Sequence, residues 1–348
     1  MNSTVINFEL FRNDSEEIYK KLKEELDLAF QQGQTSVIGL MLADGFLNKH
    51  NDLYNKIIDY ASSIGLDIKI ILGMSYDNKL DCKVIEFNFN LHTVWNSYKD
   101  TKLPLYNFNT NKFLFLGGVP NRLNRIGLLY ELYKQDLLKY AEWSFFAPWT
   151  KEQEETSKQY FSSQEDYVSF INYAERSIDS VYDNSKTYGT GDLPCATEWT
   201  HNSSWIDPEI FSKTSLSIIS EGHPKEERNS KFLTEKTYRA FVQGHPFLFA
   251  GNVPMFEYIK ELGFKTFENY FPHPDYATLP TEYERLAKLI ENLKYFVNNK
   301  IDFTADVEYN RQHFFKLAND NNKILNTLDI DKNDINHYFD RKGFGHLI

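Results

Sequence analysis

Apolar residues follow two alternating patterns along the first part of the chain: short apolar runs, and longer stretches in which they recur at helical spacing. Residues 36–42 and 67–72 are short, mainly apolar runs typical of buried parallel strands. Residues 15–30 and 51–64 carry their apolar side chains on one helical face. Strands that alternate with helices predict a Rossmann-like α/β domain, which we place at residues 1–150.

Three further elements complete this predicted domain. Residues 84–89 and 111–116 are predicted strands, with Asn88 in the polar phase of the first. Residues 126–140 are a predicted amphipathic helix with a leucine-rich face. The polar stretch that follows, residues 151–210, is expected to be a connecting segment or an insert.

A second alternation of strands and helices begins at residues 215–220 (S-L-S-I-I-S). We place a second Rossmann-like domain at residues 211–300, and residues 301–348 are expected to form C-terminal helices that can cross back to the first domain. The other elements predicted in this half are helices at 255–262, 281–298 and 306–318 and a short strand at 264–267.

The stretch Ser230–Gly251 (S-K-F-L-T-E-K-T-Y-R-A-F-V-Q-G-H-P-F-L-F-A-G) carries the clearest local signals in the chain. Ser230 or Thr234 can cap a helix, and Gly244 can end it. Residues 247–250 then form an apolar run that predicts a buried strand. We therefore expect a capped helix that leads directly into a strand of the second sheet.

A carboxylate and an ammonium group lie side by side in the first turn of this predicted helix. Free backbone N–H groups and the helix dipole favour a phosphate at such a position, and Lys236 adds positive charge. Glu235 can accept hydrogen bonds from sugar hydroxyls. The residues alone also fit an ordinary solvated first turn with a capping threonine.

The same stretch, followed by L-G-F-K-T-F at Leu262–Phe267, resembles the donor-site half of fucosyltransferase-like glycosyltransferases. It is similar in particular to a bacterial and phage group with a T-E-K-T…G-x-P-F…G-F-K-T-F pattern. The resemblance covers Leu216–Phe296 well and the remainder weakly. It implies the GT-B fold, in which two Rossmann-like domains face a cleft, with the acceptor bound by the N-terminal domain and a nucleotide-sugar donor by the C-terminal one.

Two other segments match this group in part. Arg122 and Arg125 lie in a loop that leads into a helix, where two guanidinium groups suit a diphosphate, although solvated or salt-bridged arginines fit as well. Glu221, at the end of a predicted strand, looks like a counterpart of the Glu-Asn-Ser element of fucosyltransferases, and we name it a candidate catalytic residue. In similar enzymes the residue that corresponds to Glu235 holds ribose or sugar hydroxyls.

Transfer of a sugar requires that the charge of the departing diphosphate be neutralised and that a base assist the acceptor hydroxyl. The candidates for neutralising the diphosphate are Lys236, Arg239 one turn later, and Arg125 from the other predicted domain. Thr234 lies at the same helix end and is a further candidate donor-binding residue. Asp44, after the apolar run at 36–42, is the candidate base, although Asp44 followed by glycine also fits a simple turn.

Composition and short motifs limit which cofactors, partners and cellular location are expected for this protein. The only Asp-x-Asp spacing, Asp329–Asp331, lies in a polar stretch away from any predicted strand, so we expect no metal and no other cofactor beyond the nucleotide-sugar co-substrate. With 49 acidic and 38 basic residues the net charge is −11, which disfavours general binding to nucleic-acid phosphates. Cys82 and Cys195 are too few for a disulfide scaffold. No signal sequence or membrane span is predicted, so a cytoplasmic location in a bacterium or an infected host is expected.

The function predicted from these features is metal-independent glycosyl transfer, of a hexose or pentose, from a nucleotide sugar to a hydroxyl group. The acceptor is either a glycan or a hydroxymethylated base in phage DNA, which would have to be flipped out of the duplex. The alternative is a non-catalytic carbohydrate- or nucleotide-binding protein that retains the fold. The nucleotide, the sugar, the stereochemical outcome and the oligomeric state are left open by the sequence.

Overall fold

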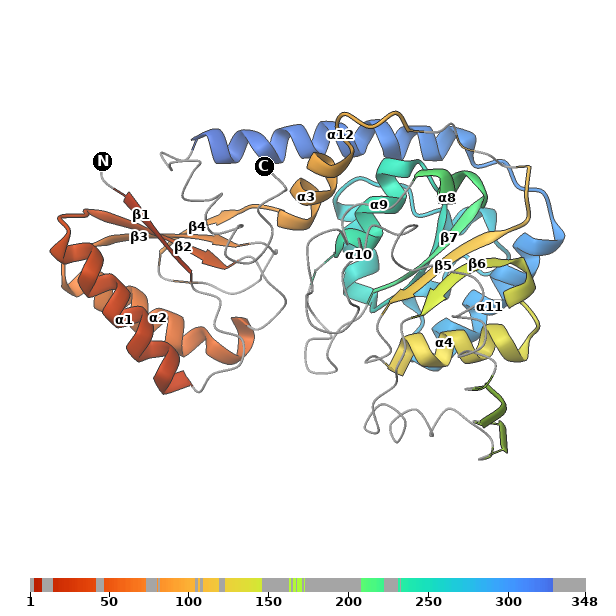
Figure 1. Ribbon diagram of the computed structural model, residues 1–348, viewed down its shortest axis with the longest axis horizontal. Helices are drawn as coiled ribbons and strands as arrows, with labels where there is room; N and C mark the ends of the chain where they lie inside the picture. Colours follow the sequence, from red (N-terminus) through yellow and green to blue (C-terminus); the bar gives the residue numbers. More distant parts are fainter. Residues whose placement is uncertain are drawn as a thin grey trace. The chain divides into compact units, whose positions relative to one another are not determined.

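The computed structural model of the chain describes residues 3–7, 15–41, 47–72, 80, 82–103, 106, 109–118, 123–145, 163, 165–166, 168–170, 172, 208–221, 231 and 233–327. The chain divides into two compact units (Figure 1). Unit 1 comprises Met1–Asn96, Asn229–Phe232 and Lys316–Ile348, and unit 2 comprises Ser97–Arg228 and Leu233–Phe315. Both units are α/β structures built on a parallel sheet, which confirms the predicted fold class at this level.

Unit 1 contains a four-stranded parallel sheet in the order β1-β2-β3-β4. The strands are Ser3–Asn7, Ser36–Met41, Asp67–Leu72 and Lys83–Glu86. Helices α1 (Ser15–Gln31) and α2 (Leu47–Ser63) connect the first three strands and lie side by side on one face of the sheet (Figure 1). Apolar side chains from both helices and from the strands form its core, among them Ile18, Leu22, Leu26, Val37, Ile57 and Ile70.

The strand predicted at residues 84–89 is wrong in its second half. Strand β4 ends at Glu86, and helix α3 (Phe89–Tyr98) begins three residues later. Asn88 causes the change, because its side-chain oxygen accepts a hydrogen bond from the Leu91 backbone N–H at 2.9 Å and so caps the helix. The Asn321 side chain holds the same residue in place by accepting from the Asn88 N–H at 2.8 Å and donating to its carbonyl at 3.1 Å.

Unit 2 contains a second four-stranded parallel sheet, in the order β6-β5-β7-β8. In chain order its strands are β5 (Phe113–Gly118), β6 (Ala141–Phe145), β7 (Leu216–Ser220) and β8 (Phe247–Ala250). Helix α4 (Leu123–Lys134) connects β5 to β6, and helix α9 (Glu235–Gln243) connects β7 to β8. Since the two connections run outward in opposite directions, α4 and α9 cover opposite faces of the sheet (Figure 1).

The boundary between the units lies upstream of the position expected from the sequence. We expected residues 1–150 to form one domain, but β5 and β6 belong to unit 2, which begins at Ser97. Strand β5 pairs with β7, with Phe113 opposite Leu216, and a pairing across so many residues leaves no local signal in the sequence. The expected connecting segment, residues 151–210, also belongs to unit 2, where Phe170 packs against the ring of Tyr130 in α4.

Two elements of unit 2 also differ from those predicted from the sequence. The helix expected at 126–140 ends at Lys134, and Asp136 takes a positive φ of 55° before the short 3-10 helix η1 (Leu138–Tyr140). The strand expected at 264–267 is wrong. The Asn310 side chain accepts a hydrogen bond from the Lys265 N–H at 2.8 Å and donates one to the Lys265 carbonyl at 2.9 Å, so it takes the place of a neighbouring strand at this residue. Phe267 has a φ of 63°, which ends the extended conformation.

The remaining helices of unit 2 pack around the sheet. They are α8 (Pro208–Ser212), α10 (Val253–Glu261), η5 (Glu268–Tyr270), η6 (Tyr276–Thr278), α11 (Glu282–Asn298) and the first part of α12 (Thr304–Thr327). Asn252 caps α10 and Thr281 caps α11, close to the predicted starts. Residues 316–327 of α12 belong to unit 1.

Candidate functional site

The candidate site lies at the carboxyl end of the central strands of unit 2. Strands β5 and β7 are neighbours, but the chain leaves β5 towards β6 and leaves β7 towards β8. The order of the strands therefore reverses between β5 and β7, and in open α/β sheets this reversal is where ligands bind. Helix α9, which carries the T-E-K-T residues, begins beside this point.

Thr234 is the cap of α9, as the sequence predicts. It has an extended backbone, and its hydroxyl oxygen accepts a hydrogen bond from the Lys236 N–H at 3.3 Å. Gly244 ends the helix in the left-handed conformation with a φ of 60°. On α12, the Arg311 guanidinium donates to the Gln243 carbonyl in the last turn of α9, which places a positive charge at the negative end of the helix dipole.

Glu221, the residue after β7, holds the start of α9 from outside the helix. One carboxylate oxygen accepts hydrogen bonds from the Thr234 N–H at 2.9 Å and the Thr237 hydroxyl at 2.6 Å. The other accepts from the Thr234 hydroxyl at 2.7 Å. Glu221 is 1% exposed, and its own N–H donates to the Ala250 carbonyl of β8. A buried carboxylate therefore already lies at the amino end of α9 and fixes it to the sheet.

Glu235, Lys236 and Arg239 form a charged cluster on the first turns of α9. The Lys236 ammonium is 2.6 Å from a Glu235 carboxylate oxygen, and the Arg239 guanidinium is 4.0 Å from the same oxygen. All three side chains are largely buried, with exposures of 19%, 16% and 8% for Lys236, Glu235 and Arg239. Burial opposes ionisation of Glu235, but the charges of Lys236 and Arg239 outweigh it and lower the pKa of the carboxyl to about 2.

Arg125 reaches the same edge of the sheet from α4. Its guanidinium is buried, and one nitrogen lies 3.5 Å from the carbonyl oxygen of Ser220 at the end of β7. We expected this arginine to come from a different domain than Lys236, and this is wrong, because both belong to unit 2. The reversal of strand order brings the first turn of α4 to the end of β7, beside the residue that anchors α9.

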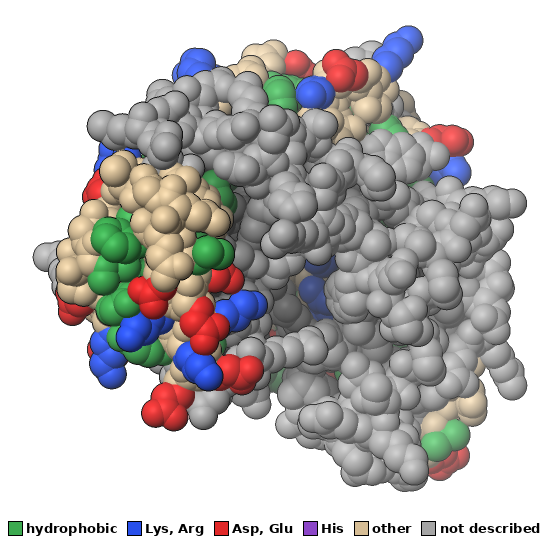
Figure 2. All heavy atoms as spheres, turned by 60° about the vertical axis from the view of Figure 1, so that its left-hand side comes forward, with side chains coloured by type: hydrophobic (Ala, Val, Ile, Leu, Met, Phe, Trp, Pro, Cys, Tyr) green, Lys and Arg blue, Asp and Glu red, His purple; other side chains and the backbone are tan. Residues whose placement is uncertain are grey.

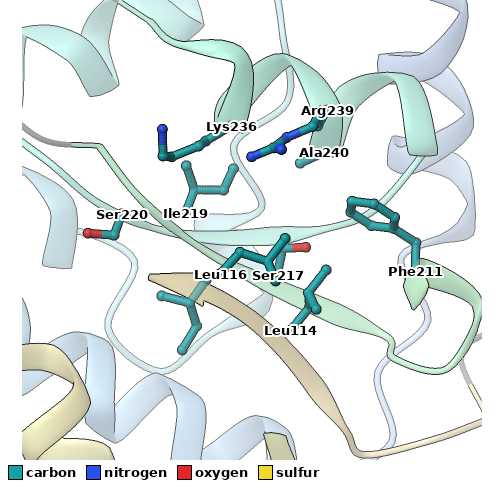
Figure 3. Close-up of a pocket in the computed structure, with 10 residues that line it drawn as sticks. Leu114, Leu116, Phe211, Ser217, Ile219, Ser220, Lys236, Arg239 and Ala240 are labelled. Atoms are coloured by element: carbon teal, nitrogen blue, oxygen red, sulfur yellow. The ribbon is translucent and has the colours of Figure 1, made fainter. Parts of the chain in front are cut away.

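A pocket lies between α9 and the strands below it, and Figure 3 shows Lys236 and Arg239 projecting from the helix over Ile219 and Ser220. Its walls are Leu114 and Leu116 of β5, Ser217–Ser220 of β7, Phe211 of α8, and Lys236, Arg239 and Ala240 of α9. Positive charge is therefore held over an otherwise mainly apolar surface. This arrangement strengthens the attraction for an anion because little water screens it.

His245 is a buried polar residue that the sequence analysis missed. Its Nε2 donates to the Thr214 carbonyl at 2.9 Å, so Nδ1 of the neutral ring accepts from the Ser217 hydroxyl at 2.7 Å. Burial lowers the pKa of the ring to about 4. A histidine inside an apolar run, directly after the glycine that ends α9, was the available signal.

Several sequence predictions lie outside the described residues or stay predictions. Asp44, Arg122 and the Asp329–Asp331 pair are outside the described residues. Within the described part of the chain, no group of three or more His, Cys, Asp and Glu side chains is placed to hold a metal ion. None of the described helices combines the length and the apolar character needed to cross a membrane.

No protein-family model matches this chain, and no curated protein matches it. Among solved structures, the chain is similar to an α,α-trehalose-phosphate synthase (UDP-forming) from Burkholderia vietnamiensis. The alignment covers 89% of this chain and 79% of that one, with 11% identity and a TM-score of 0.33. At that TM-score the likeness carries no inference about the activity of this chain.

Proposed function

We propose that this protein is a glycosyltransferase that moves a sugar from a nucleotide-sugar donor to a hydroxyl acceptor without a metal ion. One observation carries the proposal: Lys236 and Arg239 line a pocket over β7, and Arg125 lies 3.5 Å from the Ser220 carbonyl at the end of the same strand, where the strand order reverses. Three cationic side chains at such a position suit the diphosphate of a nucleotide sugar.

The departing nucleoside diphosphate gains negative charge as the bond to the sugar breaks. In the proposed reaction Lys236 and Arg239 stabilise this charge, and Arg125 adds a third cation beside the end of β7. In the complex, a phosphate group replaces Glu235 as the partner of Lys236, and the Glu235 carboxylate accepts hydrogen bonds from ribose or sugar hydroxyls. Fixed charges with little solvent around them stabilise such a transition state most effectively, because they need no reorganisation during the reaction.

We assign Glu221 a positioning role in place of the catalytic role considered from the sequence. Three hydrogen bonds from Thr234 and Thr237 engage both oxygens of its carboxylate. A general base needs a free lone pair directed at the acceptor hydroxyl. Asp44 remains the proposed base, in the unit that we propose to bind the acceptor. The two units would then form a GT-B enzyme, with the donor site in unit 2.

The acceptor is proposed to be a glycan or a hydroxymethylated base in DNA. A DNA acceptor requires a basic surface around the site. On the face drawn in Figure 2, acidic and basic side chains lie next to one another over the described surface. Helix α1 illustrates this mixture, because three lysines lie between two pairs of glutamates along it. The described part of this face therefore gives DNA no particular advantage over a glycan.

A thermal-shift screen against UDP-, GDP-, TDP- and CMP-sugars without added metal tests the proposal. A donor present at 100 times its Kd should stabilise the fold by about 2.7 kcal/mol and raise Tm by roughly 2–4 °C. Lys236→Ala should remove this shift. Lys260→Ala is the matched control, because Lys260 is also paired with a glutamate, Glu268 at 2.9 Å, but lies on α10.

Turnover separates the two functions considered from the sequence. The enzyme should release nucleoside diphosphate from the stabilising donor, slowly with water and faster with a suitable acceptor. A shift that survives Lys236→Ala, or no shift with any donor, would contradict the proposed site. A Lys236-dependent shift without turnover under any acceptor would favour a nucleotide-sugar-binding protein.

A further inference from the structure

Ser220 has a buried hydroxyl group without a hydrogen-bond partner among the described residues. It is the last residue of β7 and is 1% exposed. Ser217, three residues earlier on the same strand, is also buried, but its hydroxyl bonds to His245 Nδ1 at 2.7 Å. Both serines are among the residues that line the pocket under α9, and among the described residues only Ser217 has a hydrogen-bond partner for its hydroxyl.

An unpaired buried hydroxyl group costs free energy of folding, because the group gives up its hydrogen bonds to water and receives none in return. Alanine at this position would avoid the cost and fill nearly the same volume. A ligand that completes the hydrogen bond is one physical reason for such an arrangement, and the neighbouring charges indicate what kind of ligand it is.

Positively charged residues line the same pocket and reach the same end of β7. Lys236 and Arg239 line the same pocket, and Figure 3 draws their side chains above the strand that carries Ser220. The Arg125 guanidinium lies 3.5 Å from the Ser220 carbonyl oxygen, which holds the backbone at this residue. A hydroxyl that can rotate to donate, next to ammonium and guanidinium groups, matches the oxygen atoms of a phosphate.

We propose that Ser220 is a ligand-binding residue whose hydroxyl donates a hydrogen bond to a phosphate oxygen of the bound diphosphate, beside Lys236 and Arg239. This proposal rests on the proposed function and adds a contact that the charged residues of α9 do not provide. Helix α9 then supplies the charge, and the end of β7 supplies a donor of fixed position.

The test uses inorganic pyrophosphate as the probe, because it does not depend on which nucleotide the protein prefers. Binding is measured by titration calorimetry and folding by thermal unfolding, for the whole chain carrying Ser220→Ala or Ser217→Ala. We expect Ser220→Ala to keep or raise Tm without ligand, since no hydrogen bond is lost, and to raise the Kd for pyrophosphate about tenfold. We expect Ser217→Ala to lower Tm, because the Nδ1 atom of His245 loses its hydrogen-bond donor, which shows that the Tm measurement detects the loss of a paired buried hydroxyl.

Ser220→Cys separates the hydrogen bond from the shape of the pocket. Cysteine has nearly the size of serine but is a weak donor, so its Kd should rise towards that of the alanine variant. Wild-type affinity in both Ser220 variants would overturn the proposal, and so would a lowered Tm in Ser220→Ala, which would mean that the hydroxyl has a structural partner such as a buried water. Failure of the wild-type protein to bind pyrophosphate and every nucleotide sugar would instead contradict the proposed function itself.

Discussion

The carboxylate of Glu221 accepts hydrogen bonds from both the backbone N–H and the hydroxyl of Thr234, at 2.9 and 2.7 Å. The two residues are 13 positions apart, one at the end of β7 and the other at the start of α9. This pairing joins the sheet edge to the helix that carries the candidate phosphate-binding side chains. The geometry of Lys236 relative to the strands therefore depends on a residue that need not touch the ligand.

Glu221→Ala should destabilise the protein strongly. The substitution leaves three donors of Thr234 and Thr237 without their acceptor, and we expect the free energy of unfolding to fall by about 3 kcal/mol or more. Urea unfolding should show a lower midpoint with an unchanged slope. Glu209→Gln is a suitable control, since Glu209 is 70% exposed and its removal should change the free energy of unfolding by less than about 0.5 kcal/mol. Equal effects of the two substitutions would contradict the anchoring role.

Glu235→Gln should increase the affinity for inorganic pyrophosphate, by about tenfold at low salt. The reason is that Glu235 now neutralises Lys236 at 2.6 Å and repels an incoming anion. The same variant should gain less affinity for a nucleotide sugar, or lose some, because the carboxylate also serves the hydroxyl groups. Calorimetric titrations of both ligands measure this difference. Glu268→Gln provides a control of equal exposure, 16%, in a lysine pair away from α9, and weaker pyrophosphate binding by Glu235→Gln would disprove the expectation.

Acid should weaken the fold through His245. Burial lowers the pKa of this histidine to about 4 in the folded state, against about 6.5 when unfolded. The unfolded chain therefore binds a proton first, so the stabilisation is complete above pH 6.5 and is lost as the pH falls towards 4. Between pH 7 and pH 5 the loss from this group should be about 2 kcal/mol. Urea unfolding at the two pH values measures it, and His245→Gln should show a smaller loss; an identical loss in both proteins would contradict this assignment.

Gly244→Ala should destabilise unit 2 more than strain at a positive φ alone explains. A Cβ atom at this position would lie 2.7–2.9 Å from the guanidinium atoms of Arg311, which holds the end of α9. Gly65, with a φ of 87° and nothing within 4 Å of an added Cβ, isolates the effect of backbone strain. We expect a loss of about 1 kcal/mol for Gly65→Ala and about twice that for Gly244→Ala, measured by chemical unfolding. Similar losses would show that Arg311 moves aside freely.

Local signals predicted the candidate helix well. Thr234 can cap because its short side chain reaches the next turn, and Gly244 can end the helix because it has no Cβ atom. The apolar run at 247–250 predicted a buried strand, and these residues form β8. Local signals failed where a distant side chain replaced a backbone partner, as Asn310 does at Lys265 in the expected strand at 264–267.

The α/β class of both units and the limits of α9 could be predicted from the sequence, because these depend on side chains a few residues apart. The tertiary structure alone decided that β5 pairs with β7, that Arg125 and Lys236 belong to the same unit, and that Glu221 anchors Thr234. It also decided that Ser220 is buried without a partner while Ser217 bonds to His245. Strand pairing and burial depend on contacts between segments that lie from 13 to about a hundred residues apart, which no local pattern of apolar and polar residues records.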